Sequence, residues 1–389
     1  MKFNKIIIFT GGIETQEFFS LEMADTFVKL GYQVFDFDLT KELGSMEKLL
    51  LFYEPEKTIM LTFNFHGISG EEIFVDEWGK LFWDEMDIPC YNIVVDHPLY
   101  YHKFLKKRPK KYYHISIDRC HQKYMKKFFP NVDSDIFLPL GGTALQNDIP
   151  LSARKYDVMF TGNYTALDTF KQYITRLDDD YTAFYYGMID DLLNNTDRTL
   201  EEVAEEHIRR EIPGVTEDEL KETMPNLNFI DLYVRFYERG ELVRTLAESG
   251  IKVHVCGEGW NKLICKNPEN VISHGSKDSY QCLKMIGNSR ISLNVMPWFK
   301  DGAHDRIFNS CLNHALCVSD DSLYLKAIFK DNSDIVFYDL HQMDQVADRI
   351  KELLLNPGKL RAIADAGLEV TRKSHTWECR TKELLKQLG

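Results

Sequence analysis

The sequence predicts an α/β protein of two domains, each built on a mostly parallel β-sheet. Its 389 residues, 44% of them hydrophobic, exceed what one hydrophobic core usually supports. Apolar runs with strand character alternate with amphipathic segments in both halves. A polar stretch containing a proline, residues 143–155, separates the halves. We therefore expect one domain at 1–150, a second at 151–375 and a final helix at 376–389.

The first half opens with a β-α-β unit. Residues 5–12 are a short β-branched run that ends in glycines, residues 15–31 carry apolar side chains at helical spacing, and residues 32–39 alternate like a strand. Further strands are expected at 58–64, 91–97, 112–119 and 135–142. Ligands bind at the carboxyl ends of strands in such sheets, so the polar residues that follow them are candidates for a site.

The second half continues this alternation around an insertion. A strand lies within 156–165, and an acidic, helix-periodic insertion follows at about 165–227, with a capping pattern that starts at Thr199. A helix is expected at 230–250. The later strands are expected at 251–260, 270–275, 290–297, 315–321 and 334–339. The later helices are expected at 278–289, from about 305, and at 323–329, 343–357, 358–374 and 376–388.

Charge and composition exclude several classes of protein. A formal charge of −13 disfavours binding that neutralises many phosphates of a nucleic acid, so no nucleic-acid partner is expected. The eight cysteines are scattered without a C-x-x-C pair and are typical of reduced core residues. The apolar run at the start breaks at Gly11 and Gly12, which predicts neither a signal peptide nor a transmembrane segment, and leaves the cytoplasm as the default compartment.

Polar residues crowd the start of the helix expected from about residue 305. Its unpaired N–H groups and the positive end of its dipole attract phosphate, and Gly302 allows close approach. Arg306 offers a planar fork to phosphate oxygens, and Asn309 can bind a sugar hydroxyl. Asp305, Asn309 and Asn313 share one side of the helix, which we expect to face a cleft. The alternative is that Asp305 only neutralises the helix dipole and that Arg306 is solvated.

From Tyr156 onward, the second half resembles the donor-binding domain of GT-B glycosyltransferases, in particular the spore-maturation (CgeB-like) group of the family-4-like superfamily. The resemblance is carried by the order of turns, strands and helices over 253–321 and by the closing helices over 356–385. Looser similarity is present at 94–98 and 137–142. It implies two Rossmann-like domains that face a central cleft, the insertion within the C-terminal one, and a final helix that packs back on the N-terminal domain.

The resemblance also implies roles for the residues at the helix mouth. The family's Glu-x7-Glu motif falls on Asp301 and Asn309, and both depart from glutamate. Asn309 keeps hydrogen bonding but loses the charge, so ribose recognition is more plausible here than a carboxylate role. His304 and Arg306 become candidates for contacts with the sugar and the diphosphate.

Other donor-binding residues follow from their position in the family order. Candidates beside the nucleotide base are Gly257, Trp260, His274 and Gly275. Gly162 and Asn163 match a glycine turn that faces the interdomain cleft, and Arg239 is favoured for the diphosphate over Arg235 and Arg244. The alternatives are a surface charge for each arginine and a structural turn histidine at His274.

The candidate catalytic residues are Asp96, His97, Asp301 and His304. Asp96 and His97 end a strand on the expected acceptor side, and His66 and Asn64 end another. A histidine with a pKa near neutrality can act as a base or bind a sugar hydroxyl, although histidines at strand ends are often structural.

No metal and no tightly bound cofactor are expected. The Asp-x-Asp patterns at 36–38 and 133–135 lie in a strand and in a polar turn, and such short patterns arise by chance in an acidic chain. A helix dipole and an arginine can stabilise a phosphate instead. Residues 9–16 lack the full G-x-G-x-x-G spacing of a dinucleotide site.

The function favoured is a glycosyltransferase that moves a sugar from a nucleotide-sugar, with UDP the preferred carrier, to an acceptor hydroxyl with retention of configuration. The acceptor, whether glycan, protein or small molecule, stays open. The alternatives are a UDP-sugar epimerase of GT-B-like fold and a non-catalytic nucleotide-sugar-binding or interaction protein. Glucosylation of DNA is disfavoured by the acidic charge. The insertion fits a lid, an acceptor platform or a homodimer contact equally well.

Overall fold

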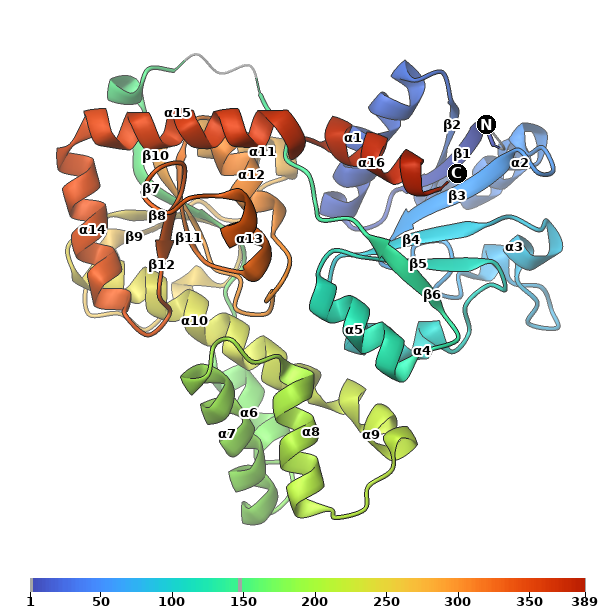
Figure 1. Ribbon diagram of the computed structural model, residues 1–389, viewed down its shortest axis with the longest axis horizontal. Helices are drawn as coiled ribbons and strands as arrows, with labels where there is room; N and C mark the ends of the chain where they lie inside the picture. The colour runs from blue at the N-terminus through green and yellow to red at the C-terminus, as the bar shows by residue number, and fades with distance from the viewer. Residues whose placement is uncertain (1–2, 146–148, 389) are drawn as a thin grey trace. The chain divides into compact units, whose positions relative to one another are not determined.

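The computed structural model describes residues 3–145 and 149–388, so that residues 146–148 of the predicted linker lie outside the described residues. The chain divides into two compact units (Figure 1). Unit 1 comprises Met1–Gly141 and Trp377–Gly389, and unit 2 comprises Gly142–Thr376. The chain therefore leaves unit 1 once and returns to it for the last helix.

Unit 1 is a six-stranded parallel sheet with the order β2-β1-β3-β4-β5-β6. Its strands are β1 (Lys5–Thr10), β2 (Gln33–Asp38), β3 (Thr58–Phe63), β4 (Cys90–Val94), β5 (Tyr112–Ser116) and β6 (Asp133–Phe137). Its helices are α1 (Glu14–Lys29), α2 (Glu42–Phe52), α3 (Phe82–Glu85), α4 (His102–Leu105), α5 (Arg119–Phe128) and α16 (Trp377–Gln387). Every residue of β1 and β3 is buried, which explains their continuous apolar sequences.

Helix α16 belongs to unit 1 although the chain reaches it last. The ring of Trp377 lies 4.8 Å from Phe19 of α1 and 6.2 Å from Phe63 of β3. Arg380 donates to the backbone oxygen of Leu140 at 3.2 Å. Burial of the Trp377 indole against two phenylalanines fixes this helix on the sheet.

Unit 2 holds a second parallel sheet with the order β12-β11-β10-β7-β8-β9. Its strands are β7 (Tyr156–Thr161), β8 (Val253–Cys256), β9 (Val271–Ser273), β10 (Ser289–Asn294), β11 (Leu316–Asp320) and β12 (Val336–Tyr338). Its helices outside the insertion are α10 (Asn228–Glu248), α11 (Ser279–Gly287), α12 (Asp305–Leu312), α13 (Leu323–Ile328), α14 (Met343–Leu355) and α15 (Pro357–Ser374). Apolar residues of α10 and α14 form one core with the central strands.

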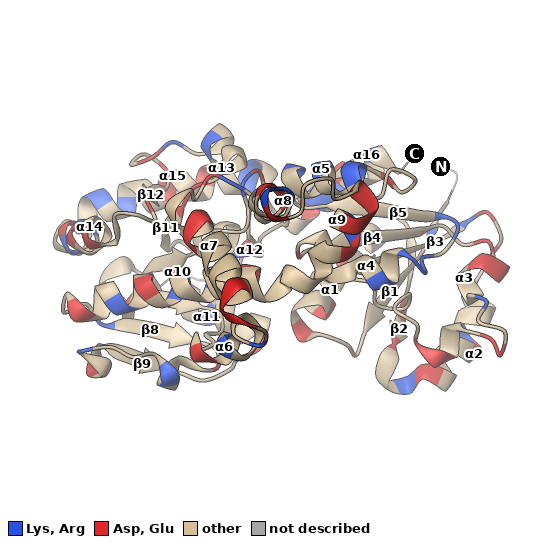
Figure 2. Ribbon diagram, turned by 90° about the horizontal axis from the view of Figure 1, so that it is seen from below, with Lys and Arg blue, Asp and Glu red and all other residues tan. Residues whose placement is uncertain are grey.

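Four helices form the insertion between β7 and α10: α6 (Asp168–Ile174), α7 (Asp179–Asn194), α8 (Leu200–Glu211) and α9 (Glu217–Thr223). Side chains cap the starts of α7, α8 and α9, whereas α6 begins without a side-chain cap. Thr199 and Thr216 each form a complete capping box, and acidic side chains fill the first turns of α7 and α9, as Figure 2 shows. The predicted fold, two parallel-sheet domains with a helical insertion in the second, is confirmed.

Among the residues that the structure describes, none of the helices combines the length and the apolar sequence needed to cross a bilayer.

Candidate functional site

The strand order of unit 2 places a switch point between β7 and β10. From β7 the chain builds outward through β8 and β9, and it then returns to the other side of β7 to form β10. Loops that leave adjacent strands in opposite directions open a crevice at their carboxyl ends, where ligands bind in this class of sheet. The loops after β7 and β8 and the start of α12 lie at this edge.

The loops after β7 and β8 are interlocked through two glycines. Gly162 (φ 151°) donates its N–H to the oxygen of Cys256 at 2.7 Å. A Cβ on Gly257 (φ 143°) would lie only 2.4 Å from the oxygen of Gly162. The Asn163 side chain accepts from the N–H of Glu258 at 2.9 Å. The two backbones therefore touch, which only glycine permits.

Trp260 contacts these loops from the core of unit 2. Its indole N–H donates to the oxygen of Gly162 at 2.8 Å, and its ring stacks on Tyr164 at 5.3 Å. Only 2% of the residue is exposed. The structure thus places Trp260 inside the core under the loop, whereas the sequence analysis expected it to border the base.

Two buried arginines converge on the same loops. Arg239 of α10 and Arg306 of α12 are each 6% exposed. Arg239 donates to the oxygen of Asn163 at 2.6 Å, and Arg306 donates to the Asn294 amide oxygen at 2.6 Å and to the Thr161 hydroxyl at 3.3 Å. Within the part of the chain that the structure describes, neither guanidinium forms an ion pair with a carboxylate, and Nε of Arg239 has no hydrogen-bond partner.

The electrostatic result is an excess of buried positive charge. Burial lowers the pKa of Arg239 well below its usual value, and the charges of Arg306 and Arg235 lower it further. Burial also lowers the pKa of Arg306, against the attraction of Asp305. Buried charges normally have partners. An anionic ligand between these two side chains would supply the missing negative charge.

A third arginine and a tryptophan border this pair. Arg235 forms an ion pair with Asp231 at 2.9 Å, and its guanidinium lies 4.1 Å over the ring of Trp298. Arg239 lies 5.7 Å from the same ring and 5.5 Å from that of Phe160. Aromatic faces stabilise cations without neutralising them, so the positive potential remains.

The mouth of α12 is formed by the residues that the sequence singled out. His304 caps the helix, with Nδ1 3.2 Å from the N–H of Arg306 and 2.6 Å from the Asp305 carboxylate. Burial and then the charge of Arg306 lower the pKa of His304, against the attraction of Asp305. Burial acts to raise the pKa of Asp305, but His304 and Arg306 outweigh it and lower that pKa. Asp301 lies half-buried just before this turn.

Gly302 is buried in the same turn, and its oxygen accepts from the hydroxyl of Ser322 at 2.7 Å. The turn is thereby hydrogen-bonded to the N-cap residue of α13. The backbone at Gly302 is held in place before any ligand arrives.

Asn309 is buried and forms its hydrogen bonds within unit 2. Its amide oxygen accepts from the N–H of Thr143 at 2.9 Å, and its NH₂ group donates to Asp305 at 2.8 Å. Asn313 binds the same segment, with its oxygen 2.9 Å from the N–H of Leu145 and its NH₂ group 2.8 Å from the oxygen of Thr143. Backbone groups that are buried need such partners, and the polar side of α12 provides them. To bind a ribose hydroxyl, Asn309 would have to give up its hydrogen bond to Thr143 or to Asp305.

His254 of β8 and His274, which directly follows β9, contact each other. Nδ1 of His254 lies 2.9 Å from Nε2 of His274, and the rings are stacked. Burial lowers the pKa of both histidines, and for His254 the charge of His274 lowers it further. Gly275, next in the chain, accepts the N–H of Gly257 at 2.9 Å through its oxygen.

Asp96 and His97 lie in unit 1, whereas Asp301 and His304 lie in unit 2. The Asp96 carboxylate accepts from the Asn64 amide at 3.0 Å and from the Tyr101 hydroxyl at 3.2 Å. His97 is 4% exposed and accepts the N–H of Leu99 at 3.1 Å. This is a capping role, which any further role of His97 would have to share.

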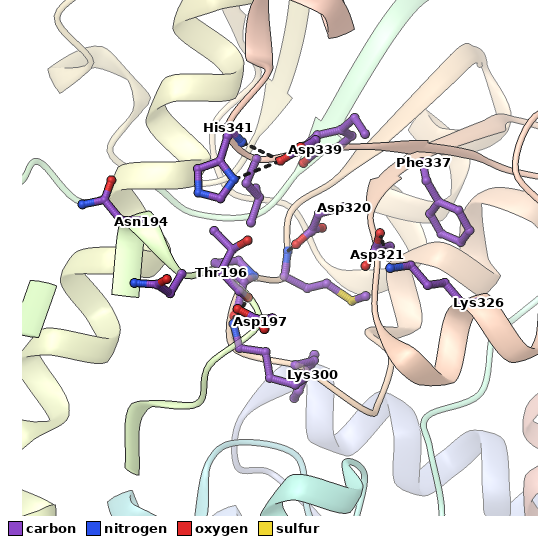
Figure 3. Close-up of a pocket in the computed structure, with 16 residues that line it drawn as sticks. Asn194, Thr196, Asp197, Lys300, Asp320, Asp321, Lys326, Phe337, Asp339 and His341 are labelled. Carbon is purple, nitrogen blue, oxygen red and sulfur yellow. Dashed lines mark hydrogen bonds and ion pairs between the residues drawn. The ribbon is translucent and has the colours of Figure 1, made fainter. Parts of the chain in front are cut away.

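Unit 2 contains a polar cavity of about 510 Å³ that was not predicted from the sequence, shown in Figure 3. The turn between α7 and α8, residues 194–197, forms one side, and the carboxyl ends of β10, β11 and β12 form the other. Lys300 joins the two sides, because its ammonium donates to the oxygen of Thr196 at 2.6 Å. The position of Asp320 at a strand end was the signal that could have found it.

Two acidic groups beside this cavity hold unusual pKa values. Asp320 is 2% exposed and accepts the N–H of Met296 through both oxygens, yet burial raises its pKa to about 7. Burial, with the charge of Asp320 next, raises the pKa of Glu238 of α10 to about 8. Desolvation dominates at both carboxyl groups.

Groups of three or more His, Cys, Asp or Glu side chains placed to hold a metal ion are absent from residues 3–145 and 149–388.

Comparison with known proteins gives a family match over the C-terminal part of the chain and similarity of fold over nearly all of it. Residues 239–386 match the family model described as glycosyl transferase-like. No curated protein matches the sequence. An alpha-glucosyltransferase in complex with UDP-glucose and DNA containing an abasic site is similar in structure, with a TM-score of 0.56 and 13% identity over 98% of both chains.

Two further solved structures show the same arrangement. Anabaena HepE in complex with UDP-glucose gives a TM-score of 0.53 and 11% identity over 99% of both chains. Sucrose-phosphate synthase from Thermosynechococcus elongatus gives a TM-score of 0.53 and 9% identity over 99% of this chain and 98% of that one. The chain has the GT-B fold, and the family match over its C-terminal part supports a glycosyltransferase.

Proposed function

We propose that the protein transfers a sugar from a nucleotide-sugar, with UDP as the nucleotide, to an acceptor hydroxyl. The observation that carries this proposal is the pair of buried guanidinium groups, Arg239 and Arg306, at the switch point of unit 2. Both bind only neutral oxygens of the protein. A diphosphate is the anion that such a pair would hold, since each guanidinium can bind two of its oxygens.

The start of α12 completes the proposed diphosphate site. The N–H groups of its first turn carry partial positive charge, and Arg306 projects from that turn. Negative charge develops on the diphosphate as the bond to the sugar breaks, so groups already aimed at it lower the barrier. We propose that these groups act without a metal ion and that the reaction retains the anomeric configuration, as the family resemblance implies.

UDP is favoured because UDP-glucose is present in two of the structures with this fold. In our proposal the glycine loops at Gly162, Gly257 and Gly275 border the nucleotide, and His304 and Asp301 lie beside the sugar. Asp96 and His97 of unit 1 are proposed for the acceptor side. Membership of the spore-maturation group is likewise part of the proposal, and the acceptor class stays open between a glycan, a protein and a small molecule.

A second candidate function is binding of a nucleotide-sugar without transfer. It is favoured by Asn309, which stands where the family has a glutamate and already binds Thr143 and Asp305. The two functions share the diphosphate site and differ in turnover. Tight UDP binding with neither transfer nor hydrolysis across a panel of donors and acceptors would favour the second.

The test is calorimetric titration of UDP, GDP and TDP into the wild-type protein and two variants. Arg306→Gln removes a proposed phosphate ligand and is expected to weaken UDP binding about 10- to 100-fold, since a hydrogen bond to a charged group contributes about 1.5–3 kcal/mol. Arg244→Gln is the matched control, because Arg244 lies on α10 but binds Glu241 and the oxygen of Ile264. Equal UDP affinity in all three proteins would refute the proposed site.

A further inference from the structure

The fold brings together two thiols that lie far apart in the sequence. Cys256 ends β8 and Cys282 lies in α11, and their sulfurs are 3.5 Å apart. Tyr156, Met159 and Met285 pack around them. All eight cysteines lie in the described residues, and none of them is in a disulfide. The Cys256–Cys282 pair is therefore a preformed dithiol with largely apolar neighbours.

This dithiol has the properties of a reactive pair. The hydrogen bond from the Cys282 thiol lowers the pKa of Cys256, and the charge of Lys277 adds to this against the effect of burial. The thiolate is the nucleophilic form of cysteine. Cys256 is buried, but Cys282 is half-buried, so a small oxidant can reach the pair from the side of α11.

The dithiol also lies directly behind the proposed donor loops. The backbone oxygen of Cys256 accepts the N–H of Gly162, and the next residue, Gly257, touches the backbone of Gly162. Asn163, after Gly162, binds Arg239 through its oxygen. A displacement of Cys256 would therefore shift the loop after β7 through one backbone hydrogen bond. An oxygen of that loop binds a buried guanidinium.

We propose that Cys256 and Cys282 are an oxidation site at which a peroxide converts the two thiols into a disulfide, and that this bridge weakens nucleotide binding at the adjacent loops. The second part rests on the function proposed above. It makes the dithiol a covalent switch of donor affinity.

The chemistry balances with the peroxide as the only co-reactant. One thiolate attacks a peroxide oxygen, the O–O bond breaks, and a sulfenic acid forms with release of one water after protonation. The second thiol attacks the sulfenic sulfur, the S–S bond forms, and a second water leaves. Two thiols and one hydrogen peroxide thus give one disulfide and two waters. The sulfurs must approach from 3.5 Å to about 2.05 Å, and the proposal requires that part of this approach displaces the end of β8.

The test uses the full-length protein, first reduced and then treated with equimolar hydrogen peroxide. Peptide mass mapping after alkylation is expected to show a Cys256–Cys282 linked peptide. UDP titration is expected to show at least a fivefold rise in Kd after oxidation, which dithiothreitol reverses. Cys282→Ser is expected to bind UDP like the wild type and to be insensitive to peroxide. Cys265→Ser, which removes a half-buried cysteine elsewhere, is the matched control and keeps the response.

Absence of the linked peptide in the oxidised wild type would overturn the oxidation site, whatever UDP does. A linked peptide with unchanged Kd would overturn the effect on nucleotide binding and leave the site. If the reduced protein does not bind UDP, the proposed function is refuted, and so is the effect of the disulfide on nucleotide binding. The oxidation site is untouched by that result, because the linked peptide is detected separately.

Discussion

Replacing Arg239 by methionine is expected to leave the stability of the ligand-free protein unchanged or higher, and to weaken UDP binding. The guanidinium is buried without a carboxylate partner and is repelled by Arg306 and Arg235. Removing such a charge in favour of an apolar side chain of similar length is neutral or stabilising by about 1–4 kcal/mol. The lost hydrogen bond to the oxygen of Asn163 offsets about 1 kcal/mol of this. We therefore expect the variant, without ligand, to melt at the wild-type temperature or up to about 4 °C higher.

The same variant is expected to lose most of its response to UDP. At a concentration 100 times the Kd, a ligand stabilises the folded state by about 2.7 kcal/mol. If the loss of Arg239 raises the Kd about 100-fold, the same UDP concentration stabilises by only about 0.4 kcal/mol. Differential scanning calorimetry with and without UDP measures both quantities. A variant that melts below the wild type and keeps the full UDP-induced shift would refute the idea that Arg239 is an unpaired charge awaiting an anion.

Further predictions concern the loops, the insertion and the buried acids. Gly257→Ala is expected to destabilise the protein by about 2 kcal/mol or more in urea unfolding, because the new Cβ meets backbone at 2.4 Å; Gly250→Ala, at φ 85° with open space, should cost only about 1 kcal/mol. Thr199→Ala removes a capping box, and faster hydrogen exchange in α8 should reflect a loss of about 1 kcal/mol. Because burial raises the pKa of Asp320 to about 7 and that of Glu238 to about 8, the folded state binds more protons than the unfolded chain, so stability should fall as pH rises from about 4 to 8. In urea unfolding across this range, the free energy of unfolding of Glu238→Gln should vary less with pH than that of the wild type. An unchanged pH profile would contradict the raised pKa of Glu238.

Much of the fold could be predicted because parallel strands buried on both faces leave an unmistakable sequence. The runs at β1, β3 and β7 are apolar without alternation, and each is followed by glycine or a polar residue. The capping box at Thr199 was equally legible, because its two partners are only three residues apart. Local physics decides such features.

The site was less predictable because its side chains are defined by distant partners. Nothing near Asn309 in the sequence indicates that its amide binds Thr143, and nothing near Trp260 indicates that its N–H binds Gly162. The pairing of Cys256 with Cys282 likewise depends on how α11 packs beside β8. Residue type predicted that these groups bind something, but only the fold decides what.

The two places where the chain crosses between the units share one anchor within unit 2. Gly142 donates its N–H to the oxygen of His375 at 2.9 Å, and Gly142 forms a parallel bridge with Thr376. The first crossing segment also forms hydrogen bonds with Asn309 of α12 and with Asn313, which directly follows this helix. The first turn of α12 carries Arg306. Both crossing segments are therefore fixed to unit 2, beside the helix that carries Arg306.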